Sequence, residues 1–169
     1  VYSFKKPTEE EFAHDFLWRI HQKCPAKGEF KIFNRSHYED VLIQRVHKWI
    51  DEERVQNRMN AINAFEDLIQ FDSNTVLLKF FLHLSKEEQR LRLLRRIRLK
   101  EKNWKFSPGD LKERKLWENY QDCYEDALNR TSKLHAPWFS IPADNKPTAR
   151  YIVAKILYDT LKAYSDIKE

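Results

Sequence analysis

The chain has 169 residues, of which 41% are hydrophobic and 34% charged, and its formal net charge at pH 7 is +5. This length corresponds to one domain or most of one, and the apolar content excludes a disordered chain. Only two glycines occur, whereas average usage would supply about a dozen. A glycine-rich loop that cradles a dinucleotide or a phosphate therefore has almost no residues to be built from.

The termini, apolar runs and cysteines bear on where the protein resides. No apolar stretch approaches the roughly 18 residues of a bilayer span, since the longest one, near 76–84, is interrupted by Lys79. The N-terminus has neither an initiator Met nor an apolar signal core, which we interpret as an internal start within a longer cytoplasmic protein. Cys24 and Cys123 lack partners at ligand spacing, which favours buried, reduced thiols over a disulfide or zinc site.

Short apolar runs followed directly by helix-start signals predict alternating strands and helices. The predicted strands are residues 2–4, 30–33, 76–84 and 138–142. Capping boxes open the helices after the first three strands: Thr8 with Glu11, Ser36 with Glu39, and Ser85 with Glu88. A fourth helix is predicted from Pro147 to about Tyr164. This alternation indicates an α/β fold with a parallel sheet and helices on both of its faces.

The spacing of apolar residues predicts which sides of these elements are buried. The helix that begins after Thr8 is expected to continue toward Cys24. The next helix is expected to bury Val41, Leu42, Val46 and Trp49, and a helix over 61–71 to bury Ile62, Phe65, Leu68 and Ile69. The strand 76–84 is nearly all apolar, which is typical of a strand buried on both faces.

The segment 33–40, Phe-Asn-Arg-Ser-His-Tyr-Glu-Asp, places polar groups at the carboxyl end of a predicted strand, where α/β folds bind ligands. Arg35 can donate two hydrogen bonds to a phosphate, and helix-start amides add a second anion-binding element. Oxygens of Asn34, Glu39 and Asp40 suit Mg²⁺, directly or through water. Alternatively, the serine and Glu39 only cap the helix while Arg35 pairs with Asp40. Spacing alone leaves both interpretations open.

The charged region 86–130 is predicted to be helical, with a break near Pro108, and an insertion after a parallel strand is where a mobile lid would lie. Its clustered basic residues are Arg92, Arg95 and Arg96. At about 100° per residue these occupy one third of the helix circumference. The tract is either a solvated basic face or a surface for an outside polyanion, and the scarcity of nearby carboxylates favours the polyanion. Asp144 and Lys146 follow the last strand, so we expect them at the same sheet edge as Asn34.

Five segments, in this order, resemble the second family of polyphosphate kinases: 32–42, 78–89, 104–107 with Asp110, 136–138 and 141–146. The resemblance covers essentially the whole chain. It implies a P-loop kinase fold of the thymidylate-kinase kind, with three α/β/α layers and a helical lid, of which residues 1–169 form a single but partial domain. It also implies Mg²⁺-dependent phosphoryl transfer between inorganic polyphosphate and AMP, ADP or ATP by a homodimer or homotetramer. The Asn-Arg-Ser-His-Tyr-Glu-Asp form is similar to the subgroup that phosphorylates both AMP and ADP.

The resemblance also implies roles for individual residues. The implied catalytic residues are Asn34, Arg35 and Asp40. The implied nucleotide-binding and metal-binding residues are Asn34, Glu39, Asp40, Asp144 and Lys146. The implied polyphosphate-binding lid residues are Arg92, Arg95 and Arg96. Family members carry a glycine-rich Walker A loop before the region where this chain begins, so we expect the parent protein to be an enzyme and this piece alone to be inactive.

Three other functions remain open at this point. The chain could be a non-catalytic module in which the basic helix binds nucleic acid, although we favour nucleotides and polyphosphate as partners. It could be a kinase-derived scaffold that has lost catalysis, or a nucleoside-monophosphate kinase that uses ATP.

Overall fold

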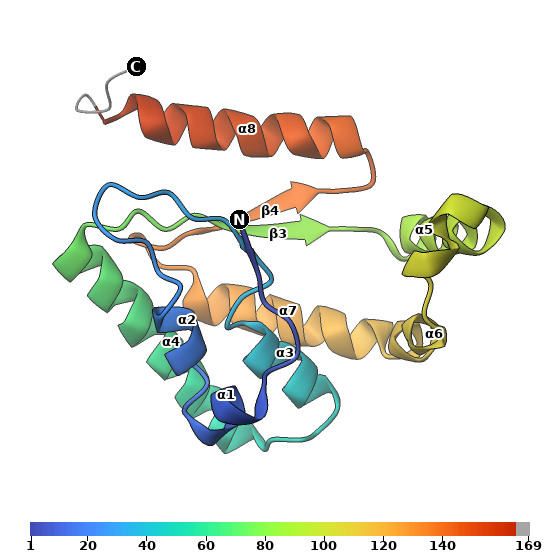
Figure 1. Ribbon diagram of the computed structural model, residues 1–169, viewed down its shortest axis with the longest axis horizontal. Helices are drawn as coiled ribbons and strands as arrows, with labels where there is room; N and C mark the ends of the chain where they lie inside the picture. The colour runs from blue at the N-terminus through green and yellow to red at the C-terminus, as the bar shows by residue number, and fades with distance from the viewer. Residues whose placement is uncertain (165–169) are drawn as a thin grey trace. The chain divides into compact units, whose positions relative to one another are not determined.

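The computed structural model describes residues 1–164, in which short strands alternate with helices (Figure 1). In chain order the elements are β1 (Tyr2–Ser3), α1 (Glu9–Ala13), α2 (Trp18–His21), β2 (Phe33–Asn34), α3 (Glu39–Val46), α4 (Glu52–Ser73), β3 (Lys79–His83), α5 (Lys86–Arg98), the 3₁₀-helix η1 (Lys100–Lys105), α6 (Pro108–Lys115), α7 (Trp117–Thr131), β4 (Trp138–Pro142) and α8 (Lys146–Lys162). They form two compact units. The first unit comprises Val1–Leu78 with Leu116–Pro137, and the second comprises Lys79–Lys115 with the chain from Trp138 on.

The first unit contains a parallel pair of short strands. β1 pairs with β2, with Tyr2 opposite Phe33 and Ser3 opposite Asn34. Phe4, directly after β1, is buried, and its ring meets that of Phe33 edge-on at 5.1 Å between centroids. The buried core around these strands consists of Phe4, Ile20, Phe65 and Ile69. The apolar residues after β1 and on α2 and α4 therefore bury the strand pair, as the hydrophobic pattern predicts.

Helix α4 presents one apolar stripe to this core. Asp51 caps its start by accepting a hydrogen bond from the Arg54 N–H at 2.8 Å, and Asn74 ends it in the left-handed conformation at φ 52°. The buried positions recur at helical spacing: Val55, Met59, Ile62, Phe65, Glu66 and Ile69. The helix predicted over 61–71 is confirmed as part of α4, but Leu68 is exposed because the stripe passes through its neighbour Ile69.

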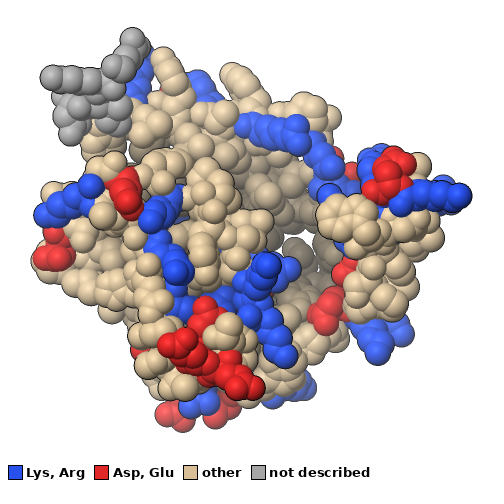
Figure 2. Space-filling model, viewed as in Figure 1, with Lys and Arg blue, Asp and Glu red and all other residues tan. Residues whose placement is uncertain are grey.

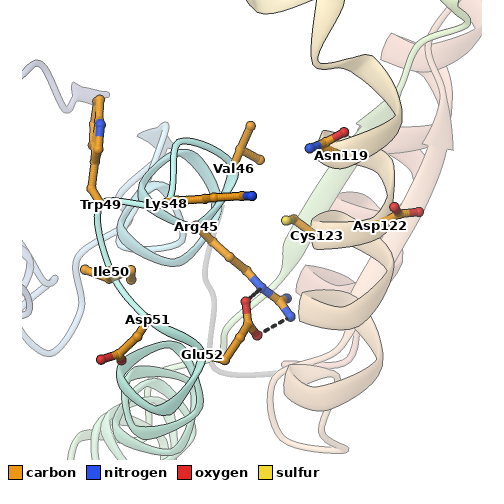
Figure 3. A pocket seen from close by; sticks show the side chains of 10 residues that line it. All are labelled: Arg45, Val46, Lys48, Trp49, Ile50, Asp51, Glu52, Asn119, Asp122 and Cys123. Atoms are coloured by element: carbon orange, nitrogen blue, oxygen red, sulfur yellow. Dashed lines mark hydrogen bonds and ion pairs between the residues drawn. The ribbon is translucent and has the colours of Figure 1, made fainter.

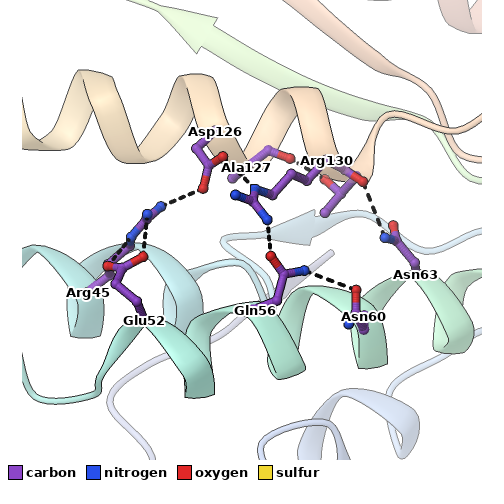
Figure 4. A network of polar contacts seen from close by, with 9 residues as sticks. Arg45, Glu52, Gln56, Asn60, Asn63, Asp126, Ala127 and Arg130 are labelled. Atoms are coloured by element: carbon purple, nitrogen blue, oxygen red, sulfur yellow. Dashed lines mark hydrogen bonds and ion pairs between the residues drawn. The ribbon is translucent and has the colours of Figure 1, made fainter.

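Helix α7 packs on α3 and α4, and polar side chains join the three helices (Figure 4). Its buried face is made of small residues: Cys123, Ala127 and Thr131. Arg45 of α3 donates to Asp126 of α7 at 2.7 Å and to Glu52 of α4 at 2.6 Å. Arg130 of α7 donates to Gln56 of α4. These contacts bring a segment distant in sequence against the first half of the chain.

The second unit contains the parallel pair β3 and β4. Their register runs from Lys79 opposite Trp138 to His83 opposite Pro142. α5 follows β3 and is capped by Ser85, whose side chain accepts from the Glu88 N–H. α8 follows β4 and begins one residue before the predicted start. The predicted α/β class with parallel strands is confirmed in both units.

The helix predicted to run from Thr8 toward Cys24 is wrong in its length. The capping box of Thr8 and Glu11 is present, but α1 ends at Ala13. The Asp15 side chain then accepts hydrogen bonds from the N–H groups of Leu17 and Trp18 at 2.9 and 3.1 Å, which starts α2 separately. A local side-chain bond to the backbone thus interrupts the helix.

The capping box predicted at Ser36 and Glu39 does not form. α3 begins at Glu39 with Tyr38 as a cap that makes no side-chain cap hydrogen bond. The Ser36 hydroxyl instead accepts from the Tyr38 N–H at 3.4 Å. The side chains of His37 and Tyr38 are fixed by buried contacts to Glu66 of α4, so tertiary structure decides where this helix starts.

Two burial predictions are also wrong. Trp49 is 66% exposed, because α3 ends at Val46 and Lys48 turns the chain in the left-handed conformation, leaving Trp49 stacked on His47. In β3 the end of the strand, including Leu82, is exposed rather than covered on both faces. β4 pairs with one of its edges.

The charged region 86–130 is helical and broken near Pro108, as predicted. It is divided between the two units: α5, η1 and α6 belong to the second unit, whereas α7 belongs to the first. The small buried residues of α7 explain this division, because they fit that helix closely to α3 and α4.

Among residues 1–164, none of the helices has the length and apolar character needed to cross a bilayer. Both cysteines are free thiols, with Cys123 buried and Cys24 half-buried.

Candidate functional site

The β2–α3 turn, residues 34–40, lies at the carboxyl end of a parallel strand in the first unit. Its start is fixed by the Phe4 N–H, which donates to the Asn34 carbonyl at 3.2 Å. Within residues 1–164, no backbone hydrogen bond engages the N–H groups of Ser36 and His37. The turn therefore offers backbone donors beside the start of α3, the kind of position where anions bind.

Arg35 occupies an unusual backbone conformation within this turn. Its φ is 64°, in the left-handed region that non-glycine residues seldom adopt. Its side chain is 61% exposed, and one guanidinium nitrogen lies 4.0 Å from the Glu39 carboxylate. The predicted alternative, in which Arg35 pairs with Asp40, is therefore not observed. Most of the guanidinium remains accessible to a ligand.

Two adjacent carboxyls at the start of α3 are partly removed from water. Burial raises the pKa of Glu39 above its usual value, while the Arg35 charge opposes the shift. Burial likewise raises the pKa of Asp40, against the opposing charges of Arg58 and Arg19. Asp40 also accepts a hydrogen bond from the Gln44 amide at 2.7 Å. Both carboxyls are thus held at a cost in solvation beside positive groups, a combination frequent at functional sites.

Two side chains of helix α4, those of Arg58 and Glu66, contact the turn and support it. The Arg58 guanidinium donates to the Asp40 carbonyl at 2.8 Å and to the Gln44 side chain at 2.9 Å. Oε1 of Glu66 lies 2.9 Å from the Tyr38 hydroxyl and 3.2 Å from His37 Nε2. Sequence reasoning missed both α4 residues. A signal was available for Glu66, because it is an acidic residue within the apolar stripe of an amphipathic helix.

The oxygen donors of the turn fit Mg²⁺, the metal that the resemblance implies. Asn34, Glu39 and Asp40 supply the hard oxygen atoms that this ion prefers, and a cation would offset the desolvation of the two carboxyls. Across residues 1–164, no three His, Cys, Asp or Glu side chains are grouped to hold a metal. An ion held by the oxygens of this turn would keep several waters and take further ligands from substrate phosphates, which is usual for Mg²⁺.

The remaining predicted site residues lie in the second unit, where two strand-to-helix turns are joined. The Ser85 N–H donates to Oδ1 of Asp144 at 2.8 Å, and this bond lowers the pKa of the Asp144 carboxyl. Arg92 donates to the carbonyls of Ala143 and Asp144 at 2.7 and 3.1 Å. Lys146, at the start of α8, is exposed. Asp144 and Arg92 thus lie together, in contacts that support the backbone.

The three predicted lid arginines on α5 differ in their surroundings. Arg92 pairs with Glu88 at 2.8 Å, and Arg96 pairs with Asp110 of α6 at 3.1 Å. Arg95 is exposed, and its side chain has no partner within residues 1–164. Figure 2 shows Lys and Arg side chains protruding at the right, interspersed with Asp and Glu. The scarcity of carboxylates inferred from the sequence is therefore wrong for two of the three arginines, because Glu88 lies one helical turn before Arg92 on α5 and Asp110 of α6 folds back onto Arg96.

The structure brings the predicted residues together in two groups. Residues of the β2–α3 turn, Asn34, Arg35, Glu39 and Asp40, are grouped in the first unit. Residues Arg92, Arg95, Arg96, Asp144 and Lys146 belong to the second unit. That the two groups share one sheet edge stays a prediction.

A separate open pocket of about 610 Å³ lies in the first unit, at the opposite end of α3 from the turn (Figure 3). It is lined by Arg45, Val46, Lys48, Trp49, Ile50, Asp51, Glu52, Asn119, Asp122 and Cys123. Arg45 and Glu52 pair with each other within it. None of the predicted site residues lines this pocket.

Comparison with known proteins identifies the family. The family model described as Polyphosphate kinase 2 (PPK2) matches residues 1–169. An AMP/ADP-polyphosphate phosphotransferase of Meiothermus ruber is 50% identical over 162 residues, which cover 96% of this chain and 60% of that protein. An ADP-polyphosphate phosphotransferase of Rhodopseudomonas palustris is 45% identical over 175 residues, with the same coverage. The chain therefore belongs to the polyphosphate kinase 2 family, as its resemblance implied.

The structural comparison agrees with this assignment. The crystal structure of Polyphosphate Kinase 2 from Arthrobacter aurescens TC1 matches with a TM-score of 0.93 at 43% identity, over 99% of this chain and 61% of that one. The present chain thus spans about 60% of the length of the relatives it matches.

Proposed function

We propose that the protein containing this chain transfers phosphoryl groups between inorganic polyphosphate and AMP, ADP or ATP, with Mg²⁺ as its metal. The observation that carries the proposal is the β2–α3 turn, where the accessible Arg35 guanidinium lies 4.0 Å from the partly desolvated carboxylate of Glu39, which the partly desolvated carboxyl of Asp40 follows in the chain. Two relatives, at 50% and 45% identity, are named as polyphosphate phosphotransferases acting with AMP/ADP and with ADP.

Phosphoryl transfer requires in-line positioning and charge neutralisation more than a protein nucleophile. Arg35 would donate to the oxygens of the transferred phosphoryl group, and the free N–H groups of Ser36 and His37 would donate to an adjacent phosphate. Asn34, Glu39 and Asp40 would hold Mg²⁺, which when bound neutralises phosphate charge. Asp144 and Lys146 would bind nucleotide, with the Lys146 ammonium group as a phosphate ligand.

We further propose that the chain forms part of one kinase-like domain of the P-loop, thymidylate-kinase-like kind, with three α/β/α layers. Within the predicted lid region 86–130, the mobile lid would comprise α5, η1 and α6, because α7 is packed into the first unit. In that lid Arg95 is the arginine available to polyphosphate, while Arg92 and Arg96 are engaged by carboxylates.

Assembly and location complete the proposal. A homodimer or homotetramer would follow the pattern that the resemblance implies. A cytoplasmic location is supported by the two free thiols, which are usual in reducing compartments. Light scattering of the purified protein would measure its oligomeric state.

The test compares phosphoryl donors with the full-length protein. ADP and Mg²⁺ are supplied with either polyphosphate or no donor, and AMP with either polyphosphate or ATP, and nucleotide products are separated by chromatography. Product formation that requires polyphosphate supports the proposal. Turnover of AMP with ATP alone would indicate a nucleoside-monophosphate kinase. Nucleic-acid binding without any turnover would indicate a binding module, with affinity falling steeply as salt rises.

A further inference from the structure

Glu66 is a buried acidic residue to which the proposed chemistry assigns no role. Its side chain is 0% exposed and lies in the α4 stripe between Ile62 and Ile69. Burying a carboxyl group is costly unless hydrogen bonds compensate for the lost water. The compensation comes from the Tyr38 hydroxyl at 2.9 Å and from His37 Nε2 at 3.2 Å, which converge on the same oxygen, Oε1.

The two residues that contact Glu66 are consecutive in the β2–α3 turn. They lie between Arg35, which precedes them, and Glu39, which follows. Both are buried, and their rings contact each other at 4.7 Å between centroids. Glu66 therefore fixes the middle of the turn to α4, the helix that also supports the Asp40 carbonyl through Arg58.

The backbone of Arg35 needs such support. Its left-handed conformation is unfavourable for a residue with a side chain, and such conformations persist where the surroundings enforce them. On one side the Asn34 carbonyl is held by the Phe4 N–H. On the other side the side chains that follow Arg35 are held by Glu66. The strained residue is thus fixed from both directions.

We propose that Glu66 is a positioning residue: through His37 and Tyr38 it holds the β2–α3 turn so that the Arg35 guanidinium faces the reacting phosphate. This inference rests on the proposed function for its kinetic consequence. Its structural content, a turn that loosens when the contact is removed, does not depend on any activity. The buried carboxyl itself touches neither substrate nor metal.

Tyr38→Phe is the main test variant, because it removes one hydrogen bond to Glu66 and keeps the ring. Glu66→Gln is the second variant, since it keeps the shape and one acceptor oxygen while replacing the carboxyl group by an amide. We expect Tyr38→Phe to lower kcat by about tenfold, the scale of one lost hydrogen bond. We expect KM for the nucleotide to change by less than about twofold, because an interaction made only in the transition state is weakened.

Two control variants separate positioning from general destabilisation. Ile69→Val removes one methyl group from the same stripe of α4 without touching the turn, and Tyr151→Phe repeats the tyrosine change on an exposed face of α8. Both should retain the kcat of the wild type. A drop in kcat for Ile69→Val equal to that of Tyr38→Phe would show that loss of stability explains the effect, and it would overturn the proposal.

A double-mutant cycle with Arg35→Ala tests whether Glu66 acts through Arg35. If it does, Glu66→Gln lowers kcat in the wild type but by less than about twofold in the Arg35→Ala background, since coupled residues are not additive. Equal losses in the two backgrounds would mean that Glu66 acts independently of Arg35, contrary to the proposal.

Amide hydrogen exchange supplies a readout that needs no turnover. Exchange in a peptide covering residues 33–40 should be faster in Tyr38→Phe than in the wild type and in Ile69→Val, with α8 unchanged in all three. Unchanged exchange in this peptide would overturn the positioning role. Absence of polyphosphate-dependent activity in the wild type would instead refute the proposed function, while exchange would still decide whether Glu66 holds the turn.

Discussion

The Ser85 backbone N–H donates to the Asp144 carboxylate at 2.8 Å, so a side chain two positions after β4 holds the backbone two positions after β3. Asp144→Asn weakens this contact by removing the charge, and Asp144→Ala removes it. Both changes should lower the melting temperature, with Ala the larger, because the Ser85 N–H loses its acceptor. Thermal unfolding followed by circular dichroism measures this shift.

Asp159→Ala is a matched control for Asp144, since Asp159 is an exposed aspartate of α8 that pairs with Lys155. Its melting temperature should stay near that of the wild type, because exposed ion pairs contribute little. A melting temperature for Asp144→Ala indistinguishable from this control would show that the Ser85 contact does not stabilise the second unit.

Replacing Arg35 by glycine should lower activity but should cost less stability than replacing it by alanine. Arg35→Ala and Arg35→Gly should each lower kcat by orders of magnitude, because the positive charge at the transferring phosphate is lost. Arg35→Gly should nevertheless be more stable than Arg35→Ala by about 1 kcal/mol, since glycine adopts the left-handed conformation at φ 64° without strain. Urea unfolding gives the stability difference. Equal stability of the two variants would contradict the strain at this residue.

Substitutions of the lid arginines should have different effects, because the contacts of these side chains differ. Arg95→Ala should raise KM for polyphosphate several-fold with the melting temperature unchanged, because its side chain is exposed and has no partner in the described chain. Arg92→Ala should cost about 1–3 kcal/mol of stability, since this side chain donates to two backbone carbonyls of the second unit. A rise in KM for the nucleotide equal to that for polyphosphate would argue against a lid role for Arg95.

The carboxyl of Asp40 should make stability fall with rising pH. Burial raises its pKa in the folded protein above the usual 3.8, so the folded state binds a proton more tightly than the unfolded state. The free energy of unfolding is therefore highest below about pH 4, and it declines as the pH rises through the raised pKa of Asp40. Asp40→Asn removes this titration.

The measurement for Asp40 is urea unfolding of the wild type and Asp40→Asn across this pH window. The variant should gain stability relative to the wild type as pH rises, and it should lose activity. Glu39→Gln provides a second comparison, because burial raises the pKa of Glu39 as well. A stability difference that stays constant with pH would show that Asp40 titrates alike in the folded and unfolded states.

Local signals predicted the features that depend on neighbouring residues. The capping box at Thr8 and the helix start at Ser85 are confirmed, because each needs only residues three positions apart. The presence of parallel strands is also confirmed, since their apolar runs precede helix starts, but the predicted bounds are wrong where β2 covers Phe33–Asn34 rather than 30–33. Leu68 and Trp49 were misassigned because the exact ends and rotation of a helix depend on what it packs against.

Contacts between distant residues could not be predicted in this way. Glu66 lies 28 residues from Tyr38, and Arg45 lies 81 residues from Asp126, so no local spacing reveals either pair. For the same reason, the start of α3 is set by the contacts that His37 and Tyr38 make with Glu66, and not by a cap at Ser36. In the candidate site, sequence identified Arg35, whose neighbours are local, but not its supports on α4.

The most direct test of the central claim measures phosphoryl transfer by the full-length protein and its Arg35→Ala variant side by side. Both receive ADP, polyphosphate and Mg²⁺, and ATP formation is followed by luminescence. Circular dichroism first establishes that the variant is folded. We expect ATP to form only with polyphosphate present and Arg35→Ala to be slower by orders of magnitude. Equal rates in the two proteins, or no ATP from the wild type with polyphosphate, would contradict polyphosphate-dependent transfer at the β2–α3 turn.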